Sequence, residues 1–307
     1  MDAVDSILFQ IIVMFSLILC GVFLYRIHWI SEETNKQLSR LVISFVNPAL
    51  MFSAYTIELK SYLIKGLLQA FGVAIVTHLL AIGISRMLLK KKHAEDYGLE
   101  RYCCIYSNCA FIGIPLVSSV YGEEGVFYVT AYITIFNLLM WSHGIMLMSK
   151  EGEFHFVKKV LCSPTIIATI LGMIVFFGQI KVPELLLEPI EYVGSMNTPL
   201  AMMVSGVTIA QSNFFQAVKN IRVYQIAFWK LLGVPLIVLF CFLFTPINHV
   251  ALMSVVLVAA CPVAAASTLL AIQYEKNAKY ASQIFGITTI LSMFTLPFLV
   301  LMGEIAF

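Results

Sequence analysis

Apolar residues along this chain fall in long blocks that short polar stretches separate. A helix needs about 20 predominantly apolar residues to cross a bilayer, and several polar connections, such as KKKHAEDYGLE at 90–100, divide blocks of about that length. The blocks lie at 6–25, 36–55, 62–88, 100–120, 125–148, 160–178, 189–210, 221–244, 250–273 and 280–303. The pattern predicts an all-α integral membrane protein with ten transmembrane helices.

The composition agrees with this fold class. Hydrophobic residues make up 60% of the 307 residues, charged residues only 12%, and the mean hydropathy is +0.92, whereas about a quarter of a soluble domain is charged. We therefore expect one membrane domain over 1–307, with the lipid bilayer around it and no nucleic-acid partner. The seven cysteines lack the spacing of a metal site or a disulfide framework, so we interpret them as packing residues and expect no metal.

Positive charges are distributed unevenly between the connections. Of the 19 Lys and Arg, Lys230 lies inside a predicted helix, Lys60, Lys65 and Lys181 lie in connections on one side, and the other 15 lie on the opposite side. Lys and Arg accumulate in cytoplasmic loops. The acidic N-terminus lacks the basic region of a signal peptide. We expect a multi-pass protein of the plasma (cytoplasmic) membrane, the cell inner membrane in bacteria, with both termini outside.

Two pairs of polar interruptions recur at nearly the same offset. VNPALMF at 46–52 contains Asn47 and Pro48, and MNTPLAMM at 196–203 contains Asn197 and Pro199. Asn108 interrupts the fourth helix, and Pro262 interrupts the ninth. Because five helices is an odd number, a second copy enters the membrane from the opposite side, which gives inverted repeats over 1–150 and 151–307. The alternative is that membrane helices simply tolerate Pro and Gly.

A broken helix in a membrane is tolerated where it is buried in protein or lines a cavity. Pro262 lacks an N–H, and the side chain of Asn108 is expected to cap a new half-helix. The start of a half-helix carries a partial positive charge of about +0.5, so two such starts that meet form an anion site. The small or hydroxyl residues Gly113, Ser267 and Thr268 are expected to complete it.

Few ionisable residues lie inside the predicted helices. All 17 carboxylates fall at helix ends or in connections, which disfavours a carboxylate-based proton pump. Lys230 either contacts an anionic substrate or reaches a neighbouring carbonyl or the headgroups. His78 either couples transport to protons or is a packed, hydrogen-bonded histidine. Asn137 is expected to face the bundle or a cavity, and His143 is expected near the interface.

The sequence resembles the auxin efflux carrier family, which includes plant PIN-type auxin carriers and bacterial malate and malonate permeases. The resemblance rests on SNCAFIGIPLVSSVYG and FYVTAYITIFNLLMWS in helices four and five, and on CPVAAASTLLAIQYEKN and ASQIFGITTILSMFTLP in helices nine and ten. It covers essentially the whole chain. The long cytoplasmic loop of the plant proteins is replaced by about ten residues, as in the short prokaryotic form.

The resemblance implies inverted five-helix repeats in which helices four and nine are broken and cross beside the substrate. It implies a scaffold at about 6–55 and 160–210, which forms a homodimer, and a transport part at about 62–148 and 221–303 that moves as an elevator. Position by position, the resemblance makes Asn108 the crossover Asn and Pro262 the crossover Pro. Together with the residues singled out above, the predicted substrate residues are Asn108, Cys109, Gly113, Pro115, Asn137, Lys230, Pro262, Ser267 and Thr268, with Asn47, Pro48, Asn197 and Pro199 on the scaffold side. Ser107 stands where the plant pattern has Pro, and no acidic partner for an embedded lysine is found.

These observations favour a secondary carrier for a small organic anion, in particular a mono- or dicarboxylate. No cofactor is expected beyond a coupling ion, which is Na⁺, H⁺ or absent. The alternative is a non-transporting membrane sensor or scaffold of the same fold. An enzyme is disfavoured because the chain has neither an HExxH motif nor a Walker loop nor a recognisable nucleophile–base set.

Overall fold

The fold, taken from a computed structural model, is described for residues 3–56, 61–89, 96–149, 164–211, 220–264 and 266–306. In these ranges the chain is helical and forms no strand apart from one isolated bridge. Helices long and apolar enough to cross a membrane are Ser61–Leu88, Cys109–Met148, Ile221–Phe242 and Ala278–Ile305, and shorter apolar helices are Ile12–Arg26, Pro164–Phe177 and His249–Ala260. The described part therefore has the character of a multi-pass membrane protein.

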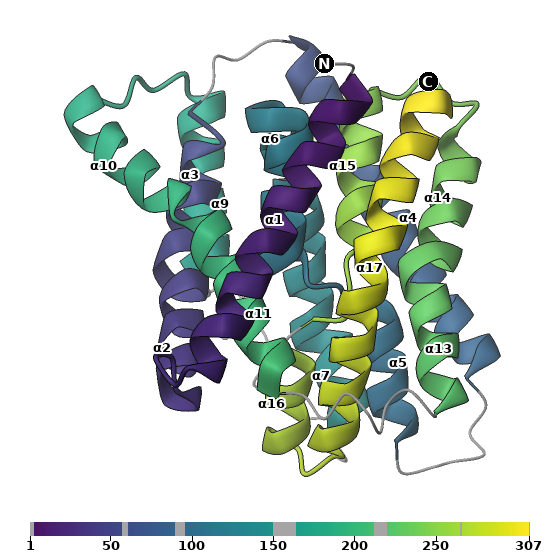
Figure 1. The fold of residues 1–307 in the computed structure, drawn as a ribbon. Helices are drawn as coiled ribbons and strands as arrows, with labels where there is room; N and C mark the ends of the chain where they lie inside the picture. Colours follow the sequence, from purple (N-terminus) through teal and green to yellow (C-terminus); the bar gives the residue numbers. More distant parts are fainter. Residues whose placement is uncertain are drawn as a thin grey trace.

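The first half of the chain forms helices up to residue 148 (Figure 1). Their bounds are α1 (Ala3–Arg26), α2 (Glu32–Leu41), η1 (Val42–Val46), α3 (Asn47–Ser53), α4 (Ser61–Leu88), α5 (Tyr97–Ile105), η2 (Cys109–Gly113), α6 (Ile114–Leu139), η3 (Met140–Gly144) and α7 (Ile145–Met148). The elements labelled η are single π-helical turns, which interrupt α-helices and often occur at functional sites.

The second half begins with α9 and ends with the long helix α17. The bounds are α9 (Pro164–Phe177), α10 (Glu184–Ser195), α11 (Asn197–Gln211), α13 (Ile221–Phe228), η4 (Trp229–Gly233), α14 (Val234–Phe242), α15 (His249–Ala260), α16 (Ala266–Gln273) and α17 (Ala278–Ala306). Figure 1 shows that α1 begins and α17 ends at the same end of the molecule.

The two proline-containing segments near residues 48 and 199 differ in their backbone. The helix from Glu32 to Ser53 is continuous, because the π-turn η1 precedes Pro48 and places it in the first turn of α3. A missing N–H is tolerated in a first turn, so the interruption expected from Pro48 is only a π-turn. In the second segment Met196 separates α10 from α11, so that helix is interrupted.

Helix α6 reverses its direction at Gly122. This residue has φ 60° and ψ −148°, a backbone conformation that glycine adopts without steric cost. The returning arm lies beside the incoming one, because the Tyr106 hydroxyl donates to the Leu139 carbonyl over 2.9 Å. The 40 residues from Cys109 to Met148 therefore form a hairpin, in the place where the sequence predicts a connection between 120 and 125.

Close helix packing joins the two halves of the chain. Helix α1 lies against α11, where a Cβ atom on Gly21 would come within 2.1 Å of the Met203 carbonyl oxygen and one on Gly206 within 1.9 Å of the Ile18 oxygen. Small residues allow membrane helices to approach this closely. Helix α15 is buried over its middle and packs against α4, α6, α14 and α17.

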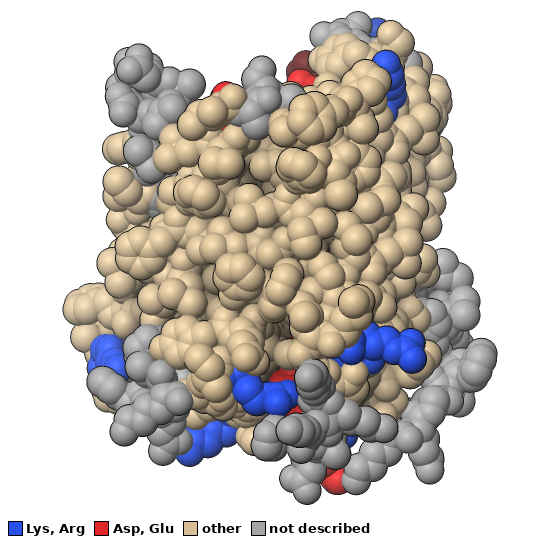
Figure 2. Space-filling view, turned by 90° about the vertical axis from the view of Figure 1, so that its right-hand side faces the viewer, with Lys and Arg blue, Asp and Glu red and all other residues tan. Residues whose placement is uncertain are grey.

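The surface has the distribution of charge expected for a membrane protein. Figure 2 shows a broad uncharged band, with most of the visible Lys and Arg gathered along its lower edge. Large apolar side chains such as Leu79, Phe240 and Phe298 point outward. An apolar exterior of this kind suits contact with lipid acyl chains.

Candidate functional site

Two short extended segments meet inside the helical bundle, between α5 and η2 and between α15 and α16. Ser107 and Val263 form an antiparallel bridge. The Asn108 amide donates to the Pro262 carbonyl over 2.7 Å, and the Ala264 amide donates to the Tyr106 carbonyl over 3.0 Å. Each broken segment thus satisfies backbone groups of the other, which is required of non-helical backbone buried in a membrane protein. We call residues 106–108 and 262–264 the paired segments.

Side chains from two other helices hold the paired segments in place. The Ser107 hydroxyl lies 2.8 Å from the Tyr132 hydroxyl on α6. The Val263 amide donates to the Thr288 hydroxyl on α17 over 3.2 Å. Sequence analysis missed Ser107, Tyr132 and Thr288 as contributors, since a hydroxyl residue in an apolar helix carries no signal of its distant partner.

The side chain of Asn108 does not form the expected helix cap. Instead, the main-chain carbonyl oxygen of Asn108 accepts hydrogen bonds from the amides of Ile112 and Gly113, each at 3.1 Å, and the π-turn η2 begins there. Asn108 is 3% exposed, and its Nδ2 atom has no hydrogen-bond partner among the described residues. A buried donor without a partner is destabilising, so this amide group retains an unused hydrogen-bond donor.

The half-helices that follow the two breaks supply further polar groups. Ser267, in the first turn of α16, is buried, and its hydroxyl has no partner in the described part of the chain. Thr268 follows it and is half-buried. Near η2, Cys109 is buried, and a Cβ atom on Gly113 would lie 3.1 Å from a methyl group of Val258. The glycine therefore lets η2 lie close to α15.

Pro115 does not break the helix in which it lies. It is buried in the first turn of α6, directly after the π-turn η2. The missing N–H of proline is tolerated at that position. The interruption lies at residues 106–108 instead, and Pro115 only continues from it.

Lys230 approaches the breaks from the other side, at the ends of α5 and α15. Its Nζ atom donates to the Ile105 carbonyl over 3.2 Å and to the Ala259 carbonyl over 3.0 Å, and the residue is 3% exposed. The π-turn η4 places it there. These contacts correspond to the alternative in which the lysine reaches neighbouring carbonyls.

A small cavity lies beside Lys230. Its volume is about 10 Å³, which leaves room for about one water molecule, and Thr77, His78 and Tyr132 contribute to its lining. The His78 Nδ1 atom lies 2.8 Å from the Ala74 carbonyl, so it carries the hydrogen, and the buried Nε2 atom has no partner among the described residues. The ring centroid of His78 is 4.7 Å from that of Tyr132.

The remaining predicted residues lie at three other places. Asn47 and Asn197 begin α3 and α11, both are buried, and each has at least one side-chain atom without a partner in the described residues. Pro48 and Pro199 are half-buried in the first turns of the same helices. Helix α11 lies in the range predicted as scaffold, and it packs against η2 next to the paired segments. Asn137 is half-buried on α6, with no described side-chain contact to them.

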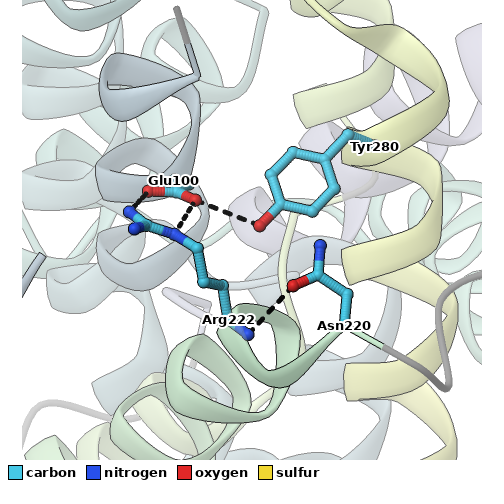
Figure 3. A network of polar contacts seen from close by, with 4 residues as sticks. All are labelled: Glu100, Asn220, Arg222 and Tyr280. Atoms are coloured by element: carbon cyan, nitrogen blue, oxygen red, sulfur yellow. Dashed lines mark hydrogen bonds and ion pairs between the residues drawn. The ribbon is translucent and has the colours of Figure 1, made fainter. Parts of the chain in front are cut away.

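The structure reveals an ion pair that sequence analysis did not find (Figure 3). The Glu100 carboxylate on α5 receives hydrogen bonds from Arg222 Nε over 2.6 Å, from Arg222 Nη2 and from the Tyr280 hydroxyl over 3.1 Å. The Asn220 side chain accepts from the Arg222 amide. The Glu100 side chain is only 2% exposed, although its position near a helix start indicated a solvated residue. The network connects α5, α13 and α17.

Comparison with known proteins gives consistent matches. The family described as "Membrane transport protein" matches residues 6–157 and 153–300. An uncharacterized transporter of Methanothermobacter thermautotrophicus is 25% identical over 291 residues, which cover 92% of this chain and 93% of that protein. An uncharacterized transporter of Methanocaldococcus jannaschii is 25% identical over 210 residues, which cover 65% of this chain and 68% of that one.

Proposed function

Because this chain belongs to the membrane transport protein family of auxin efflux carriers, we propose that it is a secondary carrier for a small organic anion, in particular a carboxylate. Membership of a transporter family implies a non-enzymatic carrier. The observation that carries the choice of an anion is the Nδ2 group of Asn108, which has no partner among the described residues and lies at the end of one paired segment, where η2 begins. A carboxylate oxygen is a suitable acceptor for this donor.

We propose that the substrate contacts the main-chain N–H groups at the starts of η2 and α16, which follow the paired segments. Half-helix N-termini attract anions because their N–H groups and dipoles point outward. Asn108 and Ser267 supply the hydrogen bonds in this proposal, Thr268 adds a hydroxyl, and Cys109 and Gly113 form the wall. Pro262 and Pro115 shape the backbone around the site, and Asn137 on α6 is a further proposed substrate contact.

The finer architecture is part of the same proposal. Ten transmembrane helices in two inverted five-helix repeats place the paired segments at the crossing of helices four and nine. The scaffold comprises about 6–55 and 160–210 and forms a homodimer, and Asn47, Pro48, Asn197 and Pro199 face the site from it. In an elevator motion, the transport part would move relative to the scaffold at the contact between α11 and η2.

The proposed orientation follows from the distribution of charge. Lys and Arg gather at one edge of the described surface, where α5 and α13 begin (Figures 1 and 2). Such an edge faces the cytoplasm, so we place the protein in the plasma membrane with both termini outside. His78 is the proposed residue for proton coupling, because it lines a cavity and its Nε2 atom has no partner among the described residues.

Uptake into proteoliposomes tests the function. A thermal-shift screen of mono- and dicarboxylates, with and without Na⁺ and at two pH values, first identifies a ligand that raises the unfolding temperature. Asn108→Asp keeps the size of the side chain but adds a negative charge, so we expect it to abolish both binding and uptake. Asn137→Ala changes a residue with no described side-chain contact to the paired segments, so it is expected to reduce uptake less. Binding without uptake by the wild type would instead indicate a sensor.

A further inference from the structure

The ammonium group of Lys230 occupies an unusual place at the ends of two helices. Ile105 is the last residue of α5, and Ala259 is the last but one of α15. The final carbonyls of a helix have no partner within it and carry about half a negative charge between them. Lys230 donates to one carbonyl from each helix. A single positive charge therefore lies at the C-terminal ends of both α5 and α15.

No carboxylate shares this place with Lys230 in the described part of the chain. Within the described part, the carboxylate of Glu100 pairs with Arg222 and not with Lys230. The side chains beside the Lys230 cavity include Thr77, His78 and Tyr132 but no Asp or Glu. Burial of an unpaired charge is costly unless its hydrogen bonds are satisfied. The carbonyl oxygens, and not an acidic side chain, therefore provide the compensation.

Carbonyl oxygens at the ends of half-helices are also the ligands by which carriers coordinate monovalent cations. We propose that the Lys230 ammonium is a tethered substitute for such a cation, and that the carbonyls of Ile105 and Ala259 form a monovalent-cation site that this lysine fills permanently. One consequence is that the wild-type carrier requires no Na⁺ to hold the two helix ends together. Only this consequence rests on the proposed function.

Removing the tether opens the site. Lys230→Ala deletes three carbons and the ammonium, a volume that matches propylammonium, and the cavity of about 10 Å³ adjoins it with room for about one water molecule. His78 also lines this cavity, and its Nε2 atom has no partner among the described residues. The emptied site has an oxygen-rich, negatively polarised lining that suits a small cation.

The test measures the unfolding temperature of the detergent-solubilised protein without substrate. We expect Lys230→Ala to unfold at a lower temperature than the wild type in tetramethylammonium chloride. Propylammonium chloride at the same ionic strength should raise it saturably, by about 2–4 °C, and leave the wild type unchanged. A rise of equal size with 1-propanol would show mere cavity filling and overturn the proposal, as would no rise with any cation.

Two further variants keep the test decisive. Lys230→Met retains the volume of the stem and removes only the charge, so it serves if the alanine variant does not fold. Its unfolding temperature should be higher in NaCl or NH₄Cl than in tetramethylammonium chloride, and equal values would contradict the proposal. Lys65→Ala, which removes an exposed lysine from α4, should show no cation effect. Because substrate is absent, these outcomes are independent of the Asn108 result.

Discussion

Arg222 and Lys230 lie about two turns apart on one helical segment, yet their charges are compensated in different ways. Arg222 is 22% exposed and forms a bidentate ion pair with the buried Glu100 carboxylate. Lys230 is almost fully buried and contacts two main-chain carbonyls. A charge with a complementary side chain is a structural element that holds α5 and α13 together. In our proposal, a charge held only by helix ends can be replaced by a free cation once the lysine side chain is removed.

The largest effect on stability should come from breaking the Arg222–Glu100 pair. Among the described residues, Arg222→Met leaves the buried carboxylate with the Tyr280 hydroxyl as its one partner. Removal of one partner from a buried pair costs about 3–5 kcal/mol. Because Arg222 is partly exposed, we expect the lower end of that range. Unfolding of the detergent-solubilised protein measures it. The double variant Arg222→Met/Glu100→Gln should recover much of the loss, and failure to recover would mean that Arg222 acts through packing alone.

The second effect in size should come from Lys230→Met. This change leaves the Ile105 and Ala259 carbonyls without their common donor, and an unsatisfied buried polar group costs about 1–3 kcal/mol. The same unfolding measurement applies. In contrast to Arg222, no substitution of an acidic residue among the described ones should restore the stability, so restoration by Glu100→Gln would remove the distinction between the two cations.

A smaller effect is expected at the anchors of the paired segments. Ser107→Ala and Tyr132→Phe each remove one partner of the 2.8 Å hydroxyl contact, and we expect a loss of about 1 kcal/mol for each. The double variant should lose less than the sum, because both changes delete the same hydrogen bond. Strict additivity in a double-mutant cycle would show that the two hydroxyls act separately.

Local sequence patterns predict many of the helices in this structure, whereas contacts between residues far apart in the sequence could not be predicted. The described helices lie largely within the predicted apolar ranges, because hydropathy reports burial in lipid residue by residue. Asn108 and Pro262 mark the interruptions because their own chemistry disfavours a helix. By contrast, the helix through Pro48 continues by means of the π-turn η1, an adjustment for which the sequence holds no local signal.

The contacts that define the site were harder to predict. Glu100 and Arg222 are 122 residues apart, and nothing near either residue identifies the other. The same holds for Val263 and Thr288. Sequence alone could therefore nominate Asn108 and Lys230 as polar residues in apolar helices, but it could not show that the lysine faces the carbonyl ends of the broken segments while Asn108 lies at the start of η2.

Asn108 differs from both Arg222 and Lys230, because it is an uncharged amide whose Nδ2 donor is unused among the described residues. Its Nδ2 atom makes no hydrogen bond among the described residues, so Asn108→Ala removes no native contact of that donor and should change the free energy of unfolding by less than about 1 kcal/mol. Uptake of the substrate identified by the thermal-shift screen should nevertheless be lost. A matched pair of measurements, unfolding and proteoliposome uptake, separates the two. If Asn108→Ala lowered stability as much as Lys230→Met does, the amide would be a structural group like Arg222, and the substrate would have to bind elsewhere.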